Sequence, residues 1–288
     1  MAGKLYLCAT PIGNLEDMTF RAVRVLKEAD LIAAEDTRNS IKLLNHFEIK
    51  TPMTSYHEYN KISKGHFLIQ KLKEGLNIAL ITDAGTPGIS DPGEELVRMC
   101  YEEGIQVTSL PGACALITGL VMSGQATRRF AFEAFLPSDK KERKKILEDL
   151  KGETRTIVLY EAPHHLPETV KELRQALGSR KATLIRELTK VHEEALMTDL
   201  DELVRKFETD RPLGECVLVL EGKDRSVIEE EERSQWLDIS VQDHVKHYEE
   251  MGLSRKDAMK QAALDRGMTR REVYQVLLER GVRGDGSQ

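Results

Sequence analysis

The sequence of 288 residues lacks any apolar run that approaches the roughly 20 residues of a membrane span. Its N-terminus has a short apolar run that leads directly into a loop, which predicts a first strand and not a signal peptide. Its four cysteines form no CxxC pair, so we expect reduced packing cysteines and neither a disulfide framework nor a zinc site. These absences predict a cytoplasmic protein without a membrane partner.

Common motifs of nucleotide sites and hydrolases are also missing. The chain contains no GxGxxG, no GxxxxGK[ST] and no GxSxG. Histidines are scattered singly except for His164 and His165, and no metal-ligand spacing repeats, so we expect no metal. The net charge of −6 gives no global attraction for nucleic acid, so any RNA contact must come from a local basic patch.

The segment "LNIALITDAGTPGISDPGEEL" (76–96) is the first informative stretch. Its apolar run, 76–81, predicts a strand buried on both faces. Asp91 is expected to cap a following helix, with Glu94 in the capping-box position. Between the expected strand and this helix, Gly85 and Gly88 permit positive φ and a close approach of another molecule to the backbone. An ordinary tight connection is the alternative, but the length of the loop and its glycines favour ligand contact.

Strand-like runs alternate with helical patterns along most of the chain, which predicts two α/β units. We expect an N-terminal α/β domain over 1–120 and a second over 121–224. The polar stretch 225–238 is expected to be an acidic linker, and 239–288 a small helical unit in which Ser254 and Thr269 cap helices. The expected strands are 4–9, 31–34, 77–81 and 106–110 in the first domain, and 130–136, 156–160, 182–186 and 216–220 in the second.

Four loops follow the strands of the first domain, and all should meet at one edge of its sheet: "ATPIGNLED", "AEDTRNS", "TDAGTPGISDPG" and "LPGACA". They are rich in glycine and proline but have no cluster of phosphate-binding cations. Such loops suit a neutral or zwitterionic ligand whose polar atoms meet backbone groups. S-adenosylmethionine, with its adenosine, amino acid and sulfonium, is a ligand of this kind.

Five motifs carry a resemblance to a known family: "ATPIGNLEDMTFRA" (9–22), "AEDTR" (34–38), "DAGTPGISDPG" (83–93), "LPGACA" (110–115) and "LYEAPHHLPETV" (159–170). The chain resembles the class III methyltransferases of the tetrapyrrole methylase superfamily, and within them the family that methylates the ribose 2′-OH of a cytidine in the decoding region of 16S rRNA. The resemblance implies two αβα domains with S-adenosylmethionine in the cleft between them. It also implies a homodimer whose substrate is 16S rRNA within the small ribosomal subunit.

The resemblance further assigns residues to the cofactor site. In place of the Gly-Asp-Pro of the tetrapyrrole enzymes this chain has Gly85-Thr86-Pro87, which removes a carboxylate and argues against tetrapyrrole chemistry. The cofactor-binding residues implied are Pro11, Ile12, Gly85, Thr86, Gly88, Ile89, Cys114, Ala115, Tyr160, Glu161, Ala162, Leu213 and Gly214.

A ribose 2′-OH must lose its proton as the methyl group moves, so a nearby base should help. We expect Glu35 or Asp36 to take that proton and Arg38 to hold an RNA phosphate. Glu161 and His164 are rival bases. In an alternative interpretation Asp36 and Arg38 only form an ion pair that braces the loop.

Two other functions stay open, a small-molecule methylase of the tetrapyrrole type and a non-catalytic RNA-binding assembly factor. Residues 254–283 contain eight Lys or Arg and four Asp or Glu, an excess that could neutralise phosphates. The run "SDKKERKK" (138–145) is either a solvated helix face or a basic rim of the cleft, and the sequence alone favours the solvated face.

Overall fold

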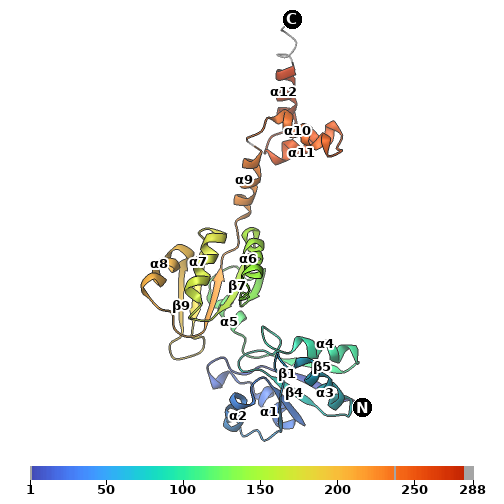
Figure 1. The fold of residues 1–288 in the computed structure, drawn as a ribbon, viewed down its shortest axis with the longest axis vertical. Coiled ribbons are helices and arrows are strands. Elements are labelled where there is room, and N and C mark those ends of the chain that lie inside the picture. Colours follow the sequence, from blue (N-terminus) through green and yellow to red (C-terminus); the bar gives the residue numbers. More distant parts are fainter. Residues whose placement is uncertain (1, 237, 282–288) are drawn as a thin grey trace. The chain divides into compact units, whose positions relative to one another are not determined.

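The computed structural model describes residues 2–236 and 238–281. By its contacts the chain divides between Gly222 and Lys223 into two compact units. The first holds two five-stranded sheets, and the described part of the second is helical. No described helix is long and apolar enough to cross a membrane. Two sheets with helices on both faces, followed along the chain by a helical unit, confirm the expected fold class (Figure 1).

The first sheet is entirely parallel, in the order β3-β2-β4-β1-β5. Its strand β4 (Ile78–Ile81) is buried at every position, as its uninterrupted apolar run predicts. The short strand β3 was not expected from the sequence. The remaining strands are β1 (Lys4–Cys8), β2 (Leu31–Ala34), β3 (Met53–Ser55) and β5 (Gln106–Leu110).

Helices cover both faces of this sheet. Successive strand residues point to opposite faces, and both sets are apolar, so each face packs against helices. In β4, Ala79 and Ile81 belong to the core with α1 and α2, whereas Ile78 and Leu80 belong to the core with α3 and α4. A 3₁₀ turn (Leu15–Asp17) precedes α1. The helices are α1 (Phe20–Glu28), α2 (Thr37–His46), α3 (Lys61–Lys73) and α4 (Glu94–Glu102).

The second sheet is mixed, in the order β6-β7-β10-β8-β9. Strands β6 and β7 are parallel, and the other neighbours are antiparallel. The edge strand β9 was not expected, and it closes a hairpin with β8. The strands are β6 (Phe130–Ala134), β7 (Thr156–Glu161), β8 (Lys181–Arg186), β9 (Glu194–Asp199) and β10 (Cys216–Leu220).

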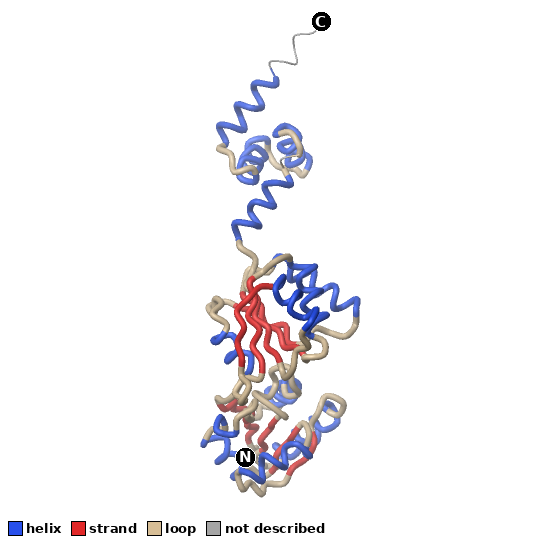
Figure 2. The backbone as a smooth tube through the Cα atoms, turned by 90° about the vertical axis from the view of Figure 1, so that its left-hand side faces the viewer, coloured by secondary structure: helices blue, strands red, loops and turns tan. Residues whose placement is uncertain are grey.

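Helices also cover both faces of the second sheet (Figure 2). One face packs against α5 (Ala115–Met122), through Leu116 and Leu120. This helix straddles the boundary expected at residue 120. The other face packs against a second group of elements, α6 (Lys140–Asp149), a 3₁₀ turn (Leu150–Gly152), α7 (Leu166–Leu177) and α8 (Leu200–Thr209).

The second unit has its own small core, built by α10, α11 and α12. The stretch expected to be an acidic linker is instead largely the helix α9, because Asp224 caps it and glutamate is a good helix former. Ser254 and Thr269 cap α11 and α12, as expected. The helices are α9 (Arg225–Gln235), α10 (Val241–Glu250), α11 (Arg255–Asp265) and α12 (Arg270–Gly281).

One of the eight Lys or Arg residues counted over 254–283 has a structural task. Arg266 donates through Nε to Nδ1 of the buried His244 at 3.0 Å, and through Nη2 to the Ile239 carbonyl at 2.6 Å. The ring of Trp236 stacks on that of His244, with the two ring centroids 3.7 Å apart. The basic excess counted from the sequence is therefore larger than the charge available to a ligand.

Candidate active site

The loops that follow β1, β4 and β5 are tied to one another by hydrogen bonds. Thr10 and Gly85 exchange two backbone hydrogen bonds, of 2.9 and 3.0 Å, and the Thr10 hydroxyl donates to the Thr82 carbonyl at 3.0 Å. Thr86 donates through its hydroxyl to the Ala113 carbonyl at 2.9 Å. Gly85 has φ of 83°, which glycine adopts without strain. The glycine-rich loop is thus a fixed wall and not a loose connection.

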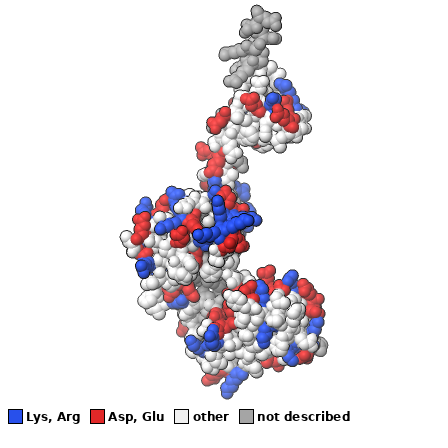
Figure 3. Space-filling view, in the orientation of Figure 1, with Lys and Arg blue, Asp and Glu red and all other residues white. Residues whose placement is uncertain are grey.

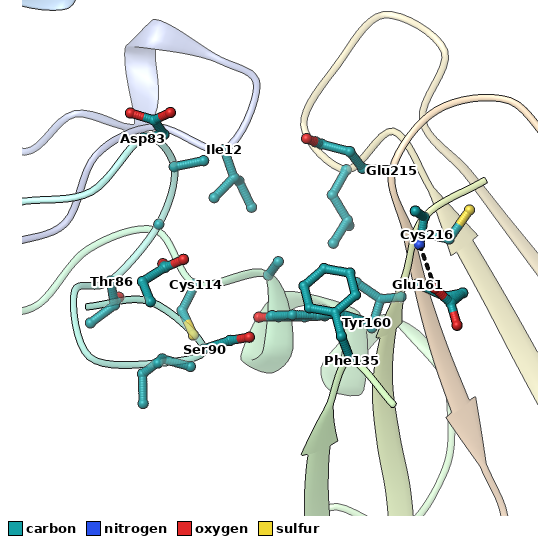
Figure 4. Close-up of a pocket in the computed structure, with 18 of the residues that line it drawn as sticks. Ile12, Asp83, Thr86, Ser90, Cys114, Phe135, Tyr160, Glu161, Glu215 and Cys216 are labelled. Atoms are coloured by element: carbon teal, nitrogen blue, oxygen red, sulfur yellow. Dashed lines mark hydrogen bonds between the residues drawn. The ribbon is translucent and has the colours of Figure 1, made fainter. Parts of the chain in front are cut away.

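A cavity of about 390 Å³ lies against this wall, a size in the range of small-molecule sites. Figure 4 shows loops of the first sheet on one side and strand ends of the second sheet on the other. Most of the chemical character of the cavity comes from two groups of side chains. One group is aromatic and the other is acidic.

The aromatic group is formed by Tyr160 and Phe135, from the ends of β7 and β6. Their ring centroids lie 5.7 Å apart, and Phe135 is half-exposed although it is apolar. The Tyr160 hydroxyl oxygen accepts from the backbone N–H of Leu116 at 2.8 Å. It thereby satisfies one of the free N–H groups in the first turn of α5, whose N-cap residue Cys114 makes no side-chain cap. Burial raises the pKa of Tyr160, so its hydroxyl stays protonated.

The acidic group gives the cavity its charge. Five carboxylates line it, and no Lys or Arg of the described residues does. Burial, together with the neighbouring charges of Glu35 and Asp83, raises the pKa of Asp91 to about 7, against a hydrogen bond from Thr82 that lowers it. Burial also raises the pKa of Glu35, although the Asp83 backbone N–H donates to it at 3.3 Å. The five are Glu35, Asp83, Asp91, Glu161 and Glu215.

Glu161 is the most enclosed of these carboxylates, with 6% of its surface exposed. It accepts a hydrogen bond from the Thr169 hydroxyl at 2.5 Å and one from the backbone N–H of Ala162 at 2.9 Å. Thr169 in turn accepts from Nη2 of Arg143 at 2.7 Å. A chain of hydrogen bonds therefore joins the cavity to the middle of α6.

The structure brings most of the expected cofactor residues together at this cavity. Nine of the thirteen line it, namely Ile12, Gly85, Thr86, Ile89, Cys114, Ala115, Tyr160, Glu161 and Ala162. Pro11, Gly88, Leu213 and Gly214 are not among its lining residues. Gly88 lies against Gly93, where a Cβ on Gly93 would come within 3.0 Å of the Gly88 nitrogen. Leu213 lines a different groove and is mostly exposed.

The three residues expected to act in catalysis separate in the structure. Glu35 lines the cavity, whereas Asp36 and Arg38 do not. Asp36 caps α2 and forms a bidentate pair with Arg38, with distances of 3.0 and 2.7 Å. Hydrogen bonds from Arg38 lower the pKa of Asp36 to about 2, which makes it a poor base. For Asp36, the alternative interpretation of an ion pair that braces the loop agrees better with this geometry.

The rival bases also differ from each other. Glu161 lines the cavity, as described above. His164 is exposed and is not among the lining residues, and its ring lies tilted against that of His165, with the centroids 4.1 Å apart. Asp91 was not expected as a site residue, because its position in the sequence predicted a helix cap. That assignment was wrong: α4 begins at Glu94, its N-cap is Gly93, and no side chain caps it. Two carboxylates that flank a glycine-rich loop, Asp83 and Asp91, were the available signal.

Comparison with known proteins is consistent with this geometry. The family model described as Tetrapyrrole (Corrin/Porphyrin) Methylases matches residues 4–204. A protein of Halalkalibacterium halodurans named Ribosomal RNA small subunit methyltransferase I is 49% identical over 274 residues, 95% of this chain and 94% of that protein. A Thermotoga maritima protein of the same name is 44% identical over 222 residues, which are 77% of this chain and the whole of that protein.

Solved structures share the fold at low sequence identity. The uroporphyrin-III C-methyltransferase of Thermus thermophilus, solved in complex with S-adenosyl homocysteine, superimposes with a TM-score of 0.54 at 19% identity, over 75% of this chain and 97% of that one. The chain belongs to the tetrapyrrole (corrin/porphyrin) methylase family, together with the relatives named ribosomal RNA small subunit methyltransferase I.

Proposed function

We propose that this chain transfers a methyl group from S-adenosylmethionine to the ribose 2′-OH of a cytidine in the decoding region of 16S rRNA, within the small ribosomal subunit. The observation that carries the proposal is a cavity at the sheet edge with five carboxylates and no lining Lys or Arg of the described residues. The substrate comes from the relatives, which are named for the RNA of the small ribosomal subunit.

The lining of the cavity fits this cofactor. S-adenosylmethionine has a sulfonium and an ammonium cation against a single carboxylate, and no phosphate, so its net positive charge is attracted by a cavity with carboxylates. Nucleotide cofactors with phosphates would meet the same carboxylates without a compensating cation. The rings of Tyr160 and Phe135, tilted by 60° to one another, offer aromatic faces and edges that an adenine can contact. When bound, S-adenosylmethionine supplies a methyl group on a cationic sulfur.

The residues of the chain must orient the reacting groups and accept one proton. Transfer of a methyl group is an in-line displacement, so the rigid wall formed by the glycine-rich loop contributes by holding the geometry. We propose the pair Glu35 and Asp91 as the proton acceptor. Their carboxyl groups interact, and the pKa of Asp91 near 7 matches a general base better than the low pKa of Asp36 does.

Arg38 is proposed as a phosphate contact beside the site and not as part of it. Its Nε and Nη2 are held by Asp36, and its side chain is 88% exposed, so the remaining donors face solvent. A homodimer and a cytoplasmic location are also part of this proposal. The homodimer rests on the family resemblance alone, and the cytoplasmic location on the sequence features described above.

The direct test is incubation of the purified chain with small ribosomal subunits and S-adenosylmethionine labelled in its methyl group, followed by mass spectrometry of the rRNA. We expect one new methyl group on the ribose of a cytidine. A methyl group on a base, or methylation of a tetrapyrrole with none on the subunit, would contradict the proposal. Glu35→Gln and Asp91→Asn should each keep cofactor affinity within a few-fold while at least one loses turnover. Normal turnover in both variants would contradict Glu35 and Asp91 as the proton acceptor.

A further inference from the structure

Helix α6 has an unusual charge pattern for a helix that only faces water. Four of its first six residues are exposed lysines: Lys140, Lys141, Lys144 and Lys145. Two pairs are spaced i, i+4, so like charges lie one above the other on the helix surface, an arrangement that destabilises a helix. The four also occupy the first two turns, where the helix dipole disfavours positive charge.

These lysines are not neutralised within the part of the chain that the structure describes. None of the four forms an ion pair with a described carboxylate. Glu148, one turn after Lys144, pairs instead with Lys151 at 2.6 Å. Figure 3 shows Lys and Arg side chains gathered over the region of α6. Carboxylates do stand four residues after Lys144 and Lys145, at Glu148 and Asp149, but neither forms an ion pair with these lysines.

The helix is nevertheless held firmly. Asp139 caps it by accepting from the backbone N–H groups of Lys141 and Glu142, at 3.1 and 2.9 Å. Arg143, the one basic residue in this run that is mostly buried, donates through Nε to Glu172 of α7 at 2.5 Å and through Nη2 to Thr169. A rigid basic face on an acidic protein is more suited to binding an anionic surface than to keeping the chain soluble.

The first turn of α6 also lies at the end of the second sheet that carries the cavity. Strands β6 and β7 are parallel, and Phe135 and Glu161, at their carboxyl ends, both line the cavity. Lys140 follows Phe135 by five residues, at most roughly 17 Å of extended chain. Through Thr169, Arg143 is two hydrogen bonds away from Glu161. A polyanion that reaches the cavity therefore passes close to these lysines.

We propose that the exposed lysine face of α6, formed by Lys140, Lys141, Lys144 and Lys145, binds phosphates of the substrate RNA next to the nucleotide that enters the cavity. The inference rests on the proposed function and assigns part of its RNA-binding surface. The Thermotoga maritima relative aligns over its whole length with 222 residues of this chain, and the first unit is also 222 residues long. This match supports an RNA-binding surface within the first unit.

The test compares two triple variants with the wild-type chain on small ribosomal subunits. The first is Lys141→Gln, Lys144→Gln and Lys145→Gln. The matched control is Lys27→Gln, Lys42→Gln and Lys50→Gln, which removes the same charge from exposed lysines of the first unit. Subunit affinity is measured at several salt concentrations, together with KM and kcat for methyl transfer, the S-adenosylmethionine affinity and the melting temperature.

For the α6 variant we expect a KM for subunits raised on the order of 10-fold or more, because about three phosphate contacts are lost. The slope of log K against log salt should fall in magnitude by about 2, at roughly 0.7 per phosphate of single-stranded RNA. Its kcat and cofactor affinity should stay within about two-fold of wild type, and its melting temperature should be equal or higher, because like-charge pairs have been removed.

The two proposals fail separately. Equal subunit affinities and equal salt slopes in the two triple variants would overturn the α6 surface, whatever the enzyme methylates. Absence of methyl transfer to subunits by the wild-type chain would overturn the proposed function. A fall in kcat with an unchanged KM would also count against the α6 surface, since it would mean that the lysines act on the cavity and not on RNA binding.

Discussion

Asp91→Asn should make the protein more stable at neutral pH while impairing the site. The pKa of Asp91 is raised from 3.8 to about 7 because the carboxyl is half-buried and faces Glu35 and Asp83. The pKa of Asp91 in the folded protein lies above that of an unfolded aspartate, so the free energy of unfolding decreases progressively as pH rises from about 4 through 7. An asparagine has the same shape and no charge to bury, and it removes this loss.

The size of the effect follows from the shift in pKa. A rise from 3.8 to about 7 corresponds to roughly 4 kcal/mol at 1.36 kcal/mol per pKa unit. Solvent reaches part of the side chain and screens its interactions, which reduces the expected effect to about 2 kcal/mol. Most of it should develop between pH 4.5 and 8.

Urea unfolding of the cofactor-free protein at pH 4.5 and at pH 8 measures this difference. The gain in stability of Asp91→Asn over wild type should be about 2 kcal/mol larger at pH 8 than at pH 4.5. Asp36→Asn is the matched control, because its carboxyl is charge-paired and its pKa is lowered to about 2. That variant should lose stability above pH 4, and the loss should shrink as pH falls toward 2. An advantage of Asp91→Asn that does not change with pH would refute the reasoning.

Other perturbations give expectations that can be checked together. A chain that ends at Gly222 should keep its cofactor affinity by calorimetry and part of its methyl transfer to subunits, as the Thermotoga maritima relative suggests; complete loss of transfer would assign RNA binding to the second unit. Tyr160→Phe removes the acceptor for the Leu116 N–H and should lower the free energy of unfolding by about 1 kcal/mol, measured in urea. Activity should survive EDTA when the Mg²⁺-dependent folding of the subunit is controlled for, since methyl displacement needs orientation and no Lewis acid; rescue by one transition metal would argue otherwise.

The parts of the fold that the sequence predicted are those in which one physical signal dominates. Strand β4 is apolar at every position because both faces of the sheet are covered. In the loop that follows it, the backbone takes positive φ at Gly85 and Gly88, which glycine adopts without strain. The missed strands, β3 and β9, are edge strands. Met53–Ser55 is only three residues long, and Glu194–Asp199 has exposed and charged residues in place of a clear alternation. Each of these strands forms because it pairs with a neighbouring strand, β2 or β8, and the residues of the strand alone do not reveal that pairing.

The site shows the same limit. Glycine positions and motif order predicted most of the residues around the cavity, but the state of each carboxylate depends on distant parts of the chain. Asp36 and Asp91 both look like helix caps in the sequence. Asp36 caps α2 and is paired with Arg38, whereas Asp91 stands two residues before the N-cap of α4 and turns to Glu35. Burial and neighbouring charges make Asp36 a strong acid and Asp91 a candidate base. The residues next to each aspartate in the sequence show neither its burial nor its neighbours in space.

The distribution of charge over the first unit follows from the two ligands it must bind. The cofactor is a cation and the RNA is a polyanion, so one surface cannot attract both. The chain keeps carboxylates inside a cavity that has no lining cation among the described residues, and it keeps lysines on the outside of α6, where they break two rules of helix stability. Arg143 lies between the two regions, donating to Thr169 and so to the chain of hydrogen bonds that ends at Glu161. A net charge of −6 is then no obstacle to RNA binding, because screening at physiological salt limits each charge to about 8 Å and makes the local arrangement decisive.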